Sequence, residues 1–226
     1  PEDPAKLVTY RGRLVDTHGS PIAGAQLRLI VATDRNADNR NDFPFNWAMI
    51  QTGQVATQNG VRRFLQAATG KDGLFHFERI PREVDTELVW WGKGVTPGRR
   101  PGLEKLGERE REAIEITLDP PARIAGRVDR TAFPGASQVV LHPTERGIID
   151  YANVMLTPDQ ETFELPGLPA GTYRVALLGP PSPAPREPGP ISPPIDAVQV
   201  RLEPGEEKKT VFDGKAAAEV APPKKQ

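Results

Sequence analysis

Few side chains in this sequence are of the types that carry out chemistry, and the most suggestive pair is His142 and Glu145. Their His-x-x-Glu spacing is one at which two side chains can ligate a zinc ion in a hydrolase. A working zinc site also needs a further histidine and a carboxylate that activates water. The other histidines, His18 and His76, both lie in the other half of the chain. We therefore interpret the spacing as chance and predict that His142 ends a strand.

Other catalytic arrangements are missing from the sequence. The three histidines and four serines are scattered, and no glycine-rich phosphate loop, nucleophile elbow or Ser-His-Asp arrangement occurs. The chain has no cysteine, which excludes disulfide bonds and thiolate chemistry. We expect a protein that is not an enzyme and needs no cofactor.

A polar run between 34 and 42 contains alternating oxygen ligands suited to a hard cation: Asp34, Asn36, Asp38 and Asp42. Calcium takes six to eight oxygens, and these residues can donate several. A calcium loop of the EF-hand type would need glycine in place of Asn39 and a bidentate glutamate in place of Phe45. Arg35 and Arg40 also offset the negative charge. The run favours a solvated loop, with calcium binding as the alternative.

Aromatic side chains are the other candidates for recognition. Phe43, Phe45 and Trp47 recur at a spacing of two, which places three rings on one face of an extended backbone. Trp90 and Trp91 are adjacent, so they point to opposite faces of a strand and one of them should face the core. The other could join the three rings as a platform for a sugar ring or an apolar partner surface. The alternative, which we favour, is that the segment folds back and its aromatics cover the sheet.

The two halves of the sequence repeat one order of motifs. The first half has GRLV at 12–15, PIAGAQLRL at 21–29 and DGLFHF at 72–77, and the second has GRV at 126–128, PGASQVVL at 134–141 and TFEL at 162–165. Repeated strand and turn patterns are typical of modules that each bury their own core. With 226 residues, the chain is long enough for two domains of about 100 residues.

Apolar alternation and turn signals predict the domain organisation. We expect a linker at 1–7, a first β-sandwich over 8–119, a second over 120–213 and a disordered tail at 214–226. The consecutive prolines Pro120 and Pro121 mark the boundary, because they stop a strand ladder and stiffen the chain. Two extended runs, at 61–69 and 74–80, flank a tight-turn signal at 70–73 and are predicted to form a hairpin.

The first half is longer than the second between equivalent motifs. Gly24 and Gly135 are 111 residues apart (135 − 24), whereas Phe75 and Phe163 are 88 apart (163 − 75). The first half therefore carries 23 extra residues (111 − 88), which we assign to an insertion at about 34–60. An insertion on a repeated scaffold is a usual place for an individual property, because loops vary without disturbing the core.

The order of these motifs resembles the carboxypeptidase regulatory-like domain family. The matching residues of the first half are Gly-x-Leu from Gly12, Pro-x-x-Gly-Ala-x-Leu-x-Leu from Pro21, Asp-Gly-x-Phe-x-Phe from Asp72, and Ile80-Pro81. The second half matches with Pro134-Gly135-Ala136 and with 163–173, but has PDQE at 158–161 where the family has Asp-Gly. Over about residues 8–212, the resemblance implies two tandem transthyretin-like, immunoglobulin-like antiparallel β-sandwiches, an all-β fold. It also implies an accessory, adhesive or spacer role in extracytoplasmic bacterial proteins, without catalysis.

Charge and hydropathy limit the partners. A formal net charge of −1 offers no attraction for nucleic acid or an anionic membrane, and no stretch approaches 18 apolar residues. The chain begins at Pro1 without methionine, which we interpret as a processed product or a fragment. We expect a binding or spacer module of a larger envelope protein, in the periplasm or at the cell surface, whose partner is a protein or a polysaccharide. The alternatives are a carbohydrate-binding accessory region of a hydrolase and a mechanical stalk.

Overall fold

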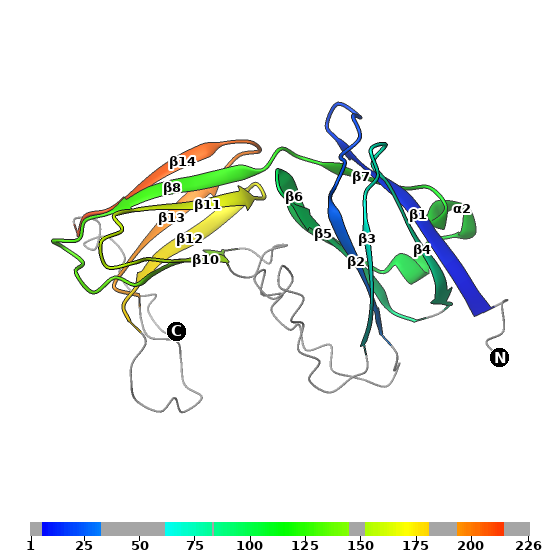
Figure 1. Cartoon of the computed structure of the whole chain (residues 1–226), viewed down its shortest axis with the longest axis horizontal. Helices are drawn as coiled ribbons and strands as arrows, with labels where there is room; N and C mark the ends of the chain where they lie inside the picture. Colours follow the sequence, from blue (N-terminus) through cyan, green and yellow to red (C-terminus); the bar gives the residue numbers. More distant parts are fainter. Residues whose placement is uncertain (1–5, 33–61, 83, 145–151, 181–193, 215–226) are drawn as a thin grey trace, which may run out of the picture. The chain divides into compact units, whose positions relative to one another are not determined.

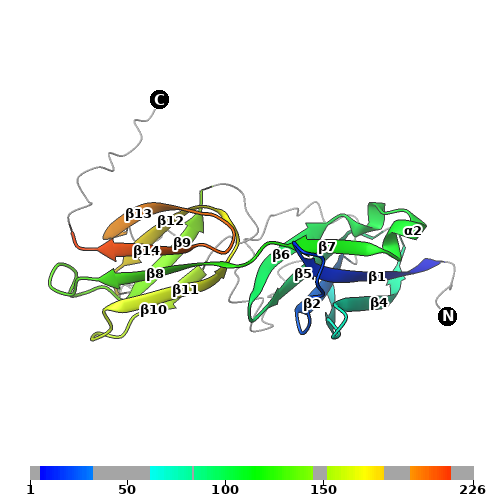
Figure 2. The same ribbon diagram turned by 90° about the horizontal axis from the view of Figure 1, so that it is seen from above.

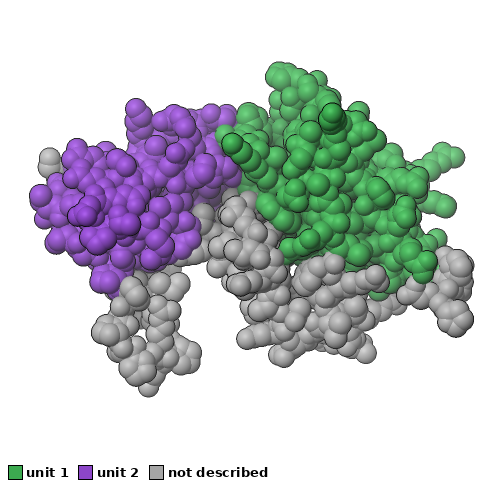
Figure 3. Space-filling model, viewed as in Figure 1, with its two compact units in different colours: residues 1–121 green, residues 122–226 purple. Residues whose placement is uncertain are grey.

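The computed structural model describes residues 6–32, 62–82, 84–144, 152–180 and 194–214. The chain divides into two compact units, Pro1–Pro121 and Ala122–Gln226, which Figure 3 shows in different colours. The predicted insertion at 34–60 and nearly all of the predicted tail lie outside the described residues. The insertion falls between the second and third strands of unit 1.

The described residues of unit 1 form seven strands in two sheets (Figure 1). One sheet has the order β4-β1-β7 and consists of β1 (Leu7–Asp16), β4 (Leu74–Pro81) and β7 (Ile114–Leu118). The other has the order β3-β2-β5-β6 and consists of β2 (Gln26–Ala32), β3 (Arg62–Ala68), β5 (Thr86–Gly92) and β6 (Val95–Pro101). The connection from β6 to β7 contains η2 (Leu103–Lys105) and α2 (Glu108–Arg111).

Unit 2 has the same strand order. Its three-stranded sheet, β11-β8-β14, consists of β8 (Ala122–Val128), β11 (Thr162–Leu168) and β14 (Glu207–Phe212). Its four-stranded sheet, β10-β9-β12-β13, consists of β9 (Gln138–Pro143), β10 (Ala152–Met155), β12 (Gly171–Leu178) and β13 (Asp196–Leu202). In each three-stranded sheet the central strand is the first strand of its unit, β1 in unit 1 and β8 in unit 2 (Figure 2). The predicted all-β sandwich class is confirmed.

Alternation along the strands builds the core of each unit. On β1, Tyr10 and Leu14 are buried whereas Arg11 and Arg13 are exposed, because successive side chains point to opposite faces of a sheet. Four aromatic residues of the repeated motifs are each 4 % exposed and belong to these cores: Phe75, Phe77, Phe163 and Tyr173. Each unit thus has its own hydrophobic core.

Gly12 and Gly126 occupy equivalent positions on the first strands of the two units. Gly12 lies opposite Phe75, and Gly126 lies opposite Phe163. A Cβ on Gly12 would lie 2.7 Å from Phe75 Cζ, and a Cβ on Gly126 would overlap the Phe163 ring and lie 2.7 Å from the Thr210 carbonyl oxygen. Glycine is required here so that a phenylalanine ring can lie directly against the backbone of the neighbouring strand.

In the part of each unit that the structure describes, the first and last strands form a parallel pair. β1 and β7 are in register from Gly12↔Ile114 to Asp16↔Leu118, and β8 and β14 from Arg123↔Glu207 to Val128↔Phe212. The other strand pairs in the described residues are antiparallel, as predicted. Because paired parallel strands run in one direction, the chain enters each unit at one end of the sheet and leaves it at the opposite end.

The predicted hairpin over 61–69 and 74–80 is wrong. β3 pairs with β2 and β4 pairs with β1, so the two strands belong to different sheets. The predicted tight turn is present, with the Gly73 N–H donating to the Gly70 carbonyl oxygen at 3.0 Å. The turn crosses between the layers because Leu65 and Phe75 pack onto one core from opposite sides.

β6 is a strand that no sequence pattern indicated. It contains Pro97, Gly98 and Pro101, residue types that are depleted in strands. β6 lies at the edge of its sheet. Proline lacks a backbone N–H, and at an edge that missing donor can face away from the neighbouring strand, so no hydrogen bond of the ladder is lost. β6 pairs with β5, and its Gly98 lies against the ring of Trp90.

Tyr173 closes the turn that leads into β12. Its hydroxyl donates a hydrogen bond to the Pro169 carbonyl oxygen at 2.8 Å. Burial of the phenol disfavours the charged form and raises the pKa of Tyr173 to about 12. The side chain is therefore a neutral structural donor at physiological pH.

Candidate functional site

The predicted contact and calcium residues before β3 lie outside the described residues: Phe43, Phe45, Trp47, Asp34, Asn36, Asp38 and Asp42. His142 is half-buried near the end of β9, and Glu145 lies outside the described residues. Among the described residues, no three His, Asp or Glu side chains are grouped so that they could hold a metal ion. That part of the chain also contains no helix of the length and apolarity needed to cross a membrane.

Trp90 is a core residue of unit 1. Its side chain is 6 % exposed, and its Nε1–H donates to the Thr96 carbonyl oxygen at 3.1 Å. The ring lies against Gly98 on β6, where an added Cβ would overlap it. Trp90 therefore uses both its ring and its donor within the sheet and has nothing left to offer a ligand. It is the member of the tryptophan pair that faces the core.

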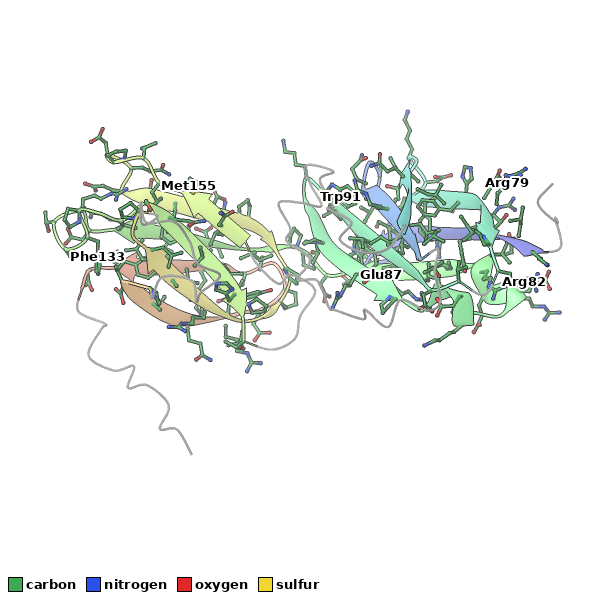
Figure 4. All side chains as sticks on the ribbon, turned by 90° about the horizontal axis from the view of Figure 1, so that it is seen from below. Arg79, Arg82, Glu87, Trp91, Phe133 and Met155 are labelled. Atoms are coloured by element: carbon green, nitrogen blue, oxygen red, sulfur yellow. The ribbon has the colours of Figure 1, made fainter. Side chains whose placement is uncertain are left out.

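Trp91 points to the opposite side of the same strand and is half-buried (Figure 4). The Arg28 Cζ atom lies over its ring, 5.5 Å from the centroid, at a distance where a guanidinium is attracted to the negative face of the ring. Arg28 is itself 4 % exposed, and burial lowers the pKa of its guanidinium. A cation of this kind needs nearby partners, and the indole ring provides one of them.

We call the surface around this pair the outer face: the outward side of β2 and β5, formed by Arg28, Ile30, Glu87, Val89 and Trp91. In the ladder, Arg28 lies opposite Val89 and Ile30 opposite Glu87. Ile30 is 5 % exposed and Val89 is 3 % exposed. Glu87, labelled with Trp91 in Figure 4, forms an ion pair with Arg99 of β6 at 3.8 Å. The outer face is thus apolar at its centre and charged at its border.

A second candidate surface is a groove of about 740 Å³ on the outward side of the three-stranded sheet of unit 1. Arg11 forms an ion pair with Glu112 at 3.3 Å, and Arg13 forms one with Glu115 at 2.6 Å. These four side chains are about half exposed, so each pair contributes little to stability, on the order of 0.5 kcal/mol. The groove presents both signs of charge and therefore suits a polar partner.

Sequence reasoning missed this groove. Arg13 and Glu115 are 102 positions apart and meet only because β1 pairs with β7. Unit 2 carries the same arrangement on its central strand, where Arg123 is paired with Glu164 and Glu207, and Arg127 with Glu161. The available signal was the alternation of arginine with buried residues on the first strand of each unit.

No family model matches the chain, and no curated protein matches it. Similar solved structures include the Bacillus anthracis TIE protein, at 10 % identity and a TM-score of 0.31, covering 92 % of this chain and 34 % of that chain. They also include the shaft pilin SpaA from Lactobacillus rhamnosus GG, at 7 % identity and a TM-score of 0.28, covering 92 % of this chain and 98 % of that chain. A streptococcal ancillary pilin is 14 % identical to this chain, with a TM-score of 0.30. The match covers 94 % of this chain and 64 % of that chain.

This chain spans about a third of the length of the Bacillus anthracis protein. TM-scores of this size assign neither a fold nor a function, and the architecture described above rests on the strand order of this chain. The resemblance to the carboxypeptidase regulatory-like family accordingly stays a prediction from the sequence motifs.

Proposed function

We propose that the chain is a non-catalytic, extracytoplasmic binding and spacer region of a larger bacterial envelope protein, built from two carboxypeptidase regulatory-like, transthyretin-like domains. The observation that carries the proposal is the parallel pairing of first and last strands in both units. The chain enters each unit at one end of the parallel pair and leaves it at the other, so it crosses the full length of that pair. A parallel pair of six residues such as β8 and β14 spans roughly 20 Å along its axis.

The parallel pairs also give each unit resistance to tension. Pulling on the two ends of a unit slides β1 along β7, or β8 along β14, so that all hydrogen bonds of the ladder bear the force together. Pulling the strands apart sideways breaks the same hydrogen bonds one after another, which needs less force. A spacer or stalk that holds a partner away from the cell surface needs the geometry in which force acts along the paired strands.

Force spectroscopy on the full chain tests the spacer function. Pulled from its two termini, the chain should unfold in two separate events, one for each unit, because each unit has its own core. Because the natural chain has no cysteine, attachment sites can be introduced singly. Extension without discrete events would contradict the proposal.

The matched control pulls unit 2 in the other geometry. Val128 and Phe212 are register partners, so Thr131→Cys and Gln226→Cys place both attachments after the same end of the β8–β14 pair. Unit 2 should then unfold at a clearly lower force than when the chain is pulled from its termini. Equal forces in the two geometries would show that the parallel pair is not the mechanical element.

Carbohydrate binding in support of a hydrolase is the second candidate function, and the half-buried ring of Trp91 is the observation that favours it. Phe43, Phe45 and Trp47 would complete the platform. Titration with cell-envelope polysaccharides should then change the tryptophan fluorescence in a saturable way, and Trp91→Ala should abolish the change. An unchanged signal with every polysaccharide would exclude this function and leave a protein partner.

A further inference from the structure

One edge strand of unit 2, β13, lacks the features that hinder strand pairing at most other edges of the chain. A strand at the edge of a sheet presents unpaired backbone N–H and C=O groups that a further strand can bind. The edge strands β4 and β11 are paired with a register shift, β6 contains two prolines, β14 contains two adjacent lysines, and β10 has only four residues. β13 has seven residues and contains no proline, glycine or lysine.

The two units differ at this edge. The equivalent strand of unit 1 is β6, whose pairing with β5 contains a register shift. β13 instead pairs with β12 along its whole length, from Gly171↔Leu202 to Leu177↔Asp196, without a shift. A regular, uninterrupted edge is the kind onto which a further strand adds most readily. The open edge is thus a property of unit 2 and not of the repeated architecture.

The hydrogen bonds of β12 show which backbone groups of β13 are unpaired. The Thr172 carbonyl oxygen accepts from the N–H of Thr144, which follows β9, at 2.9 Å. Because successive residues of a strand point their backbone groups to opposite neighbours, the even-numbered residues of β12 bind β9 and the odd-numbered ones bind β13. The register partners of those odd-numbered residues are the even-numbered residues of β13. The backbone groups of three β13 residues accordingly point away from β12: Ala197, Gln199 and Arg201.

Part of this edge is satisfied within the chain and part is not. The Ala197 N–H donates to Asp196 Oδ1 at 2.8 Å. Among the described residues, nothing pairs with the backbone N–H and C=O groups of Gln199 and Arg201. Both of these residues are exposed, so a strand can approach them. They offer two donors and two acceptors in the phase that an antiparallel strand requires.

The side chains beside the edge indicate which strand it accepts. Val198 and Val200 lie on the inward face, and cross-strand pairing favours apolar residues next to them. On the outward face, Arg201 uses only its Nε in the ion pair with Glu203, at 3.2 Å, so its two terminal nitrogens remain for a carboxylate. The outward side chains of β13 include no acidic residue, so a second copy of β13 cannot supply that carboxylate.

We propose that β13 is the docking site for an extended segment of a protein partner, which adds to the sheet as an antiparallel strand. The segment carries apolar side chains beside Val198 and Val200 and an acidic side chain beside Arg201. The proposal rests on the binding role proposed for the chain, and it supplies the surface and the mode of recognition.

Amide hydrogen exchange in the full chain tests the open edge before any ligand is added. The N–H groups of Gln199 and Arg201 should exchange about 100-fold faster than those of Val198 and Val200, which bind β12. Slow exchange at all four positions in dilute solution would show that the edge is already covered and would overturn the proposal. Protection of Gln199 and Arg201 that grows with chain concentration would assign the edge to a second copy instead.

A nine-residue peptide in which valine alternates with threonine and glutamate is the probe for strand addition. It should bind the full chain saturably and slow the exchange of the Gln199 and Arg201 amides about tenfold or more. The residues paired with Gln199 and Arg201 are the outward ones, so methylating the backbone nitrogens of threonine and glutamate should abolish binding. Methylating those of valine should leave binding unchanged. Equal effects of the two methylated peptides would mean that the peptide does not add as a strand.

Substitutions at Gln199 provide the matched pair. Gln199→Pro removes one N–H of the edge and should lower the affinity for the peptide about tenfold. Because this N–H does not bind β12, unit 2 should stay folded, which circular dichroism checks. Gln199→Thr keeps the N–H and should bind as the natural chain does. If the peptide does not bind while the chain still unfolds in two events under force, the docking site is wrong and the spacer function stands.

Discussion

Replacing Trp90 by alanine is expected to lower the free energy of unfolding of unit 1 by about 4 kcal/mol. The indole ring is 6 % exposed, belongs to the core of unit 1 and lies against Gly98 of β6. The substitution leaves a cavity and also removes the donor that satisfies the Thr96 carbonyl oxygen. Equilibrium unfolding in denaturant, followed by far-ultraviolet circular dichroism and by calorimetry, measures the change.

Trp91→Ala is the matched control for this substitution, because it removes the same side chain from the next residue of the same strand. Trp91 is half-buried and its specific contact is with Arg28, so we expect a loss of about 1 kcal/mol. If Trp91→Ala lowered the free energy of unfolding as much as Trp90→Ala, both rings would contribute equally to the packing of unit 1. That result would contradict the assignment of Trp90 to the core and of Trp91 to the opposite face.

Gly126→Ala is expected to destabilise unit 2 by about 3 kcal/mol. The added Cβ would meet the Phe163 ring and the Thr210 carbonyl oxygen, and a backbone oxygen held in the parallel ladder cannot move aside. Calorimetry should show a lower transition temperature for unit 2. All three tryptophans precede residue 122, so tryptophan fluorescence follows unit 1 and should report an unchanged transition.

Gly135→Ala is the control for the glycine substitution within the same unit. A Cβ there meets nothing nearer than Pro180 Cδ at 3.9 Å, and its φ is not in the left-handed region. Gly135→Ala should change the free energy of unfolding of unit 2 by less than about 0.5 kcal/mol. In addition, Phe163→Leu should recover part of the loss in the Gly126→Ala background, because a smaller side chain leaves room for the methyl group. Additive losses in the double variant would contradict the proposed overlap.

Period-two alternation in the sequence marks a strand by local pattern alone. On Gln26–Ala32, Leu27 and Leu29 alternate with Gln26 and Arg28, and the strand appears there with its leucines in the core. β6 has no such alternation and contains two prolines, and it is a strand because it pairs with β5 at the edge of the sheet. The turn at 70–73 was also recognisable from the sequence. The residues of a turn, however, do not determine whether the strands on either side of it pair with each other or belong to different sheets.

The candidate site was predictable only in part, for the same reason. The adjacency of Trp90 and Trp91 showed that one ring faces inward, but the choice depends on which strand lies beside them and on the space that Gly98 leaves. The outer face and the charged groove are made by residues distant in sequence, such as Arg28 with Trp91 and Arg13 with Glu115. No local pattern contains that information.

Local patterns were enough to show an all-β chain with two repeated sets of motifs, because alternation and turn chemistry are local properties. Tertiary structure alone decided the partner of each strand, the parallel closure of both units, the inward direction of Trp90 and the burial of Arg28. Alternation defines two faces of a strand, but only packing of the whole unit decides what each face meets.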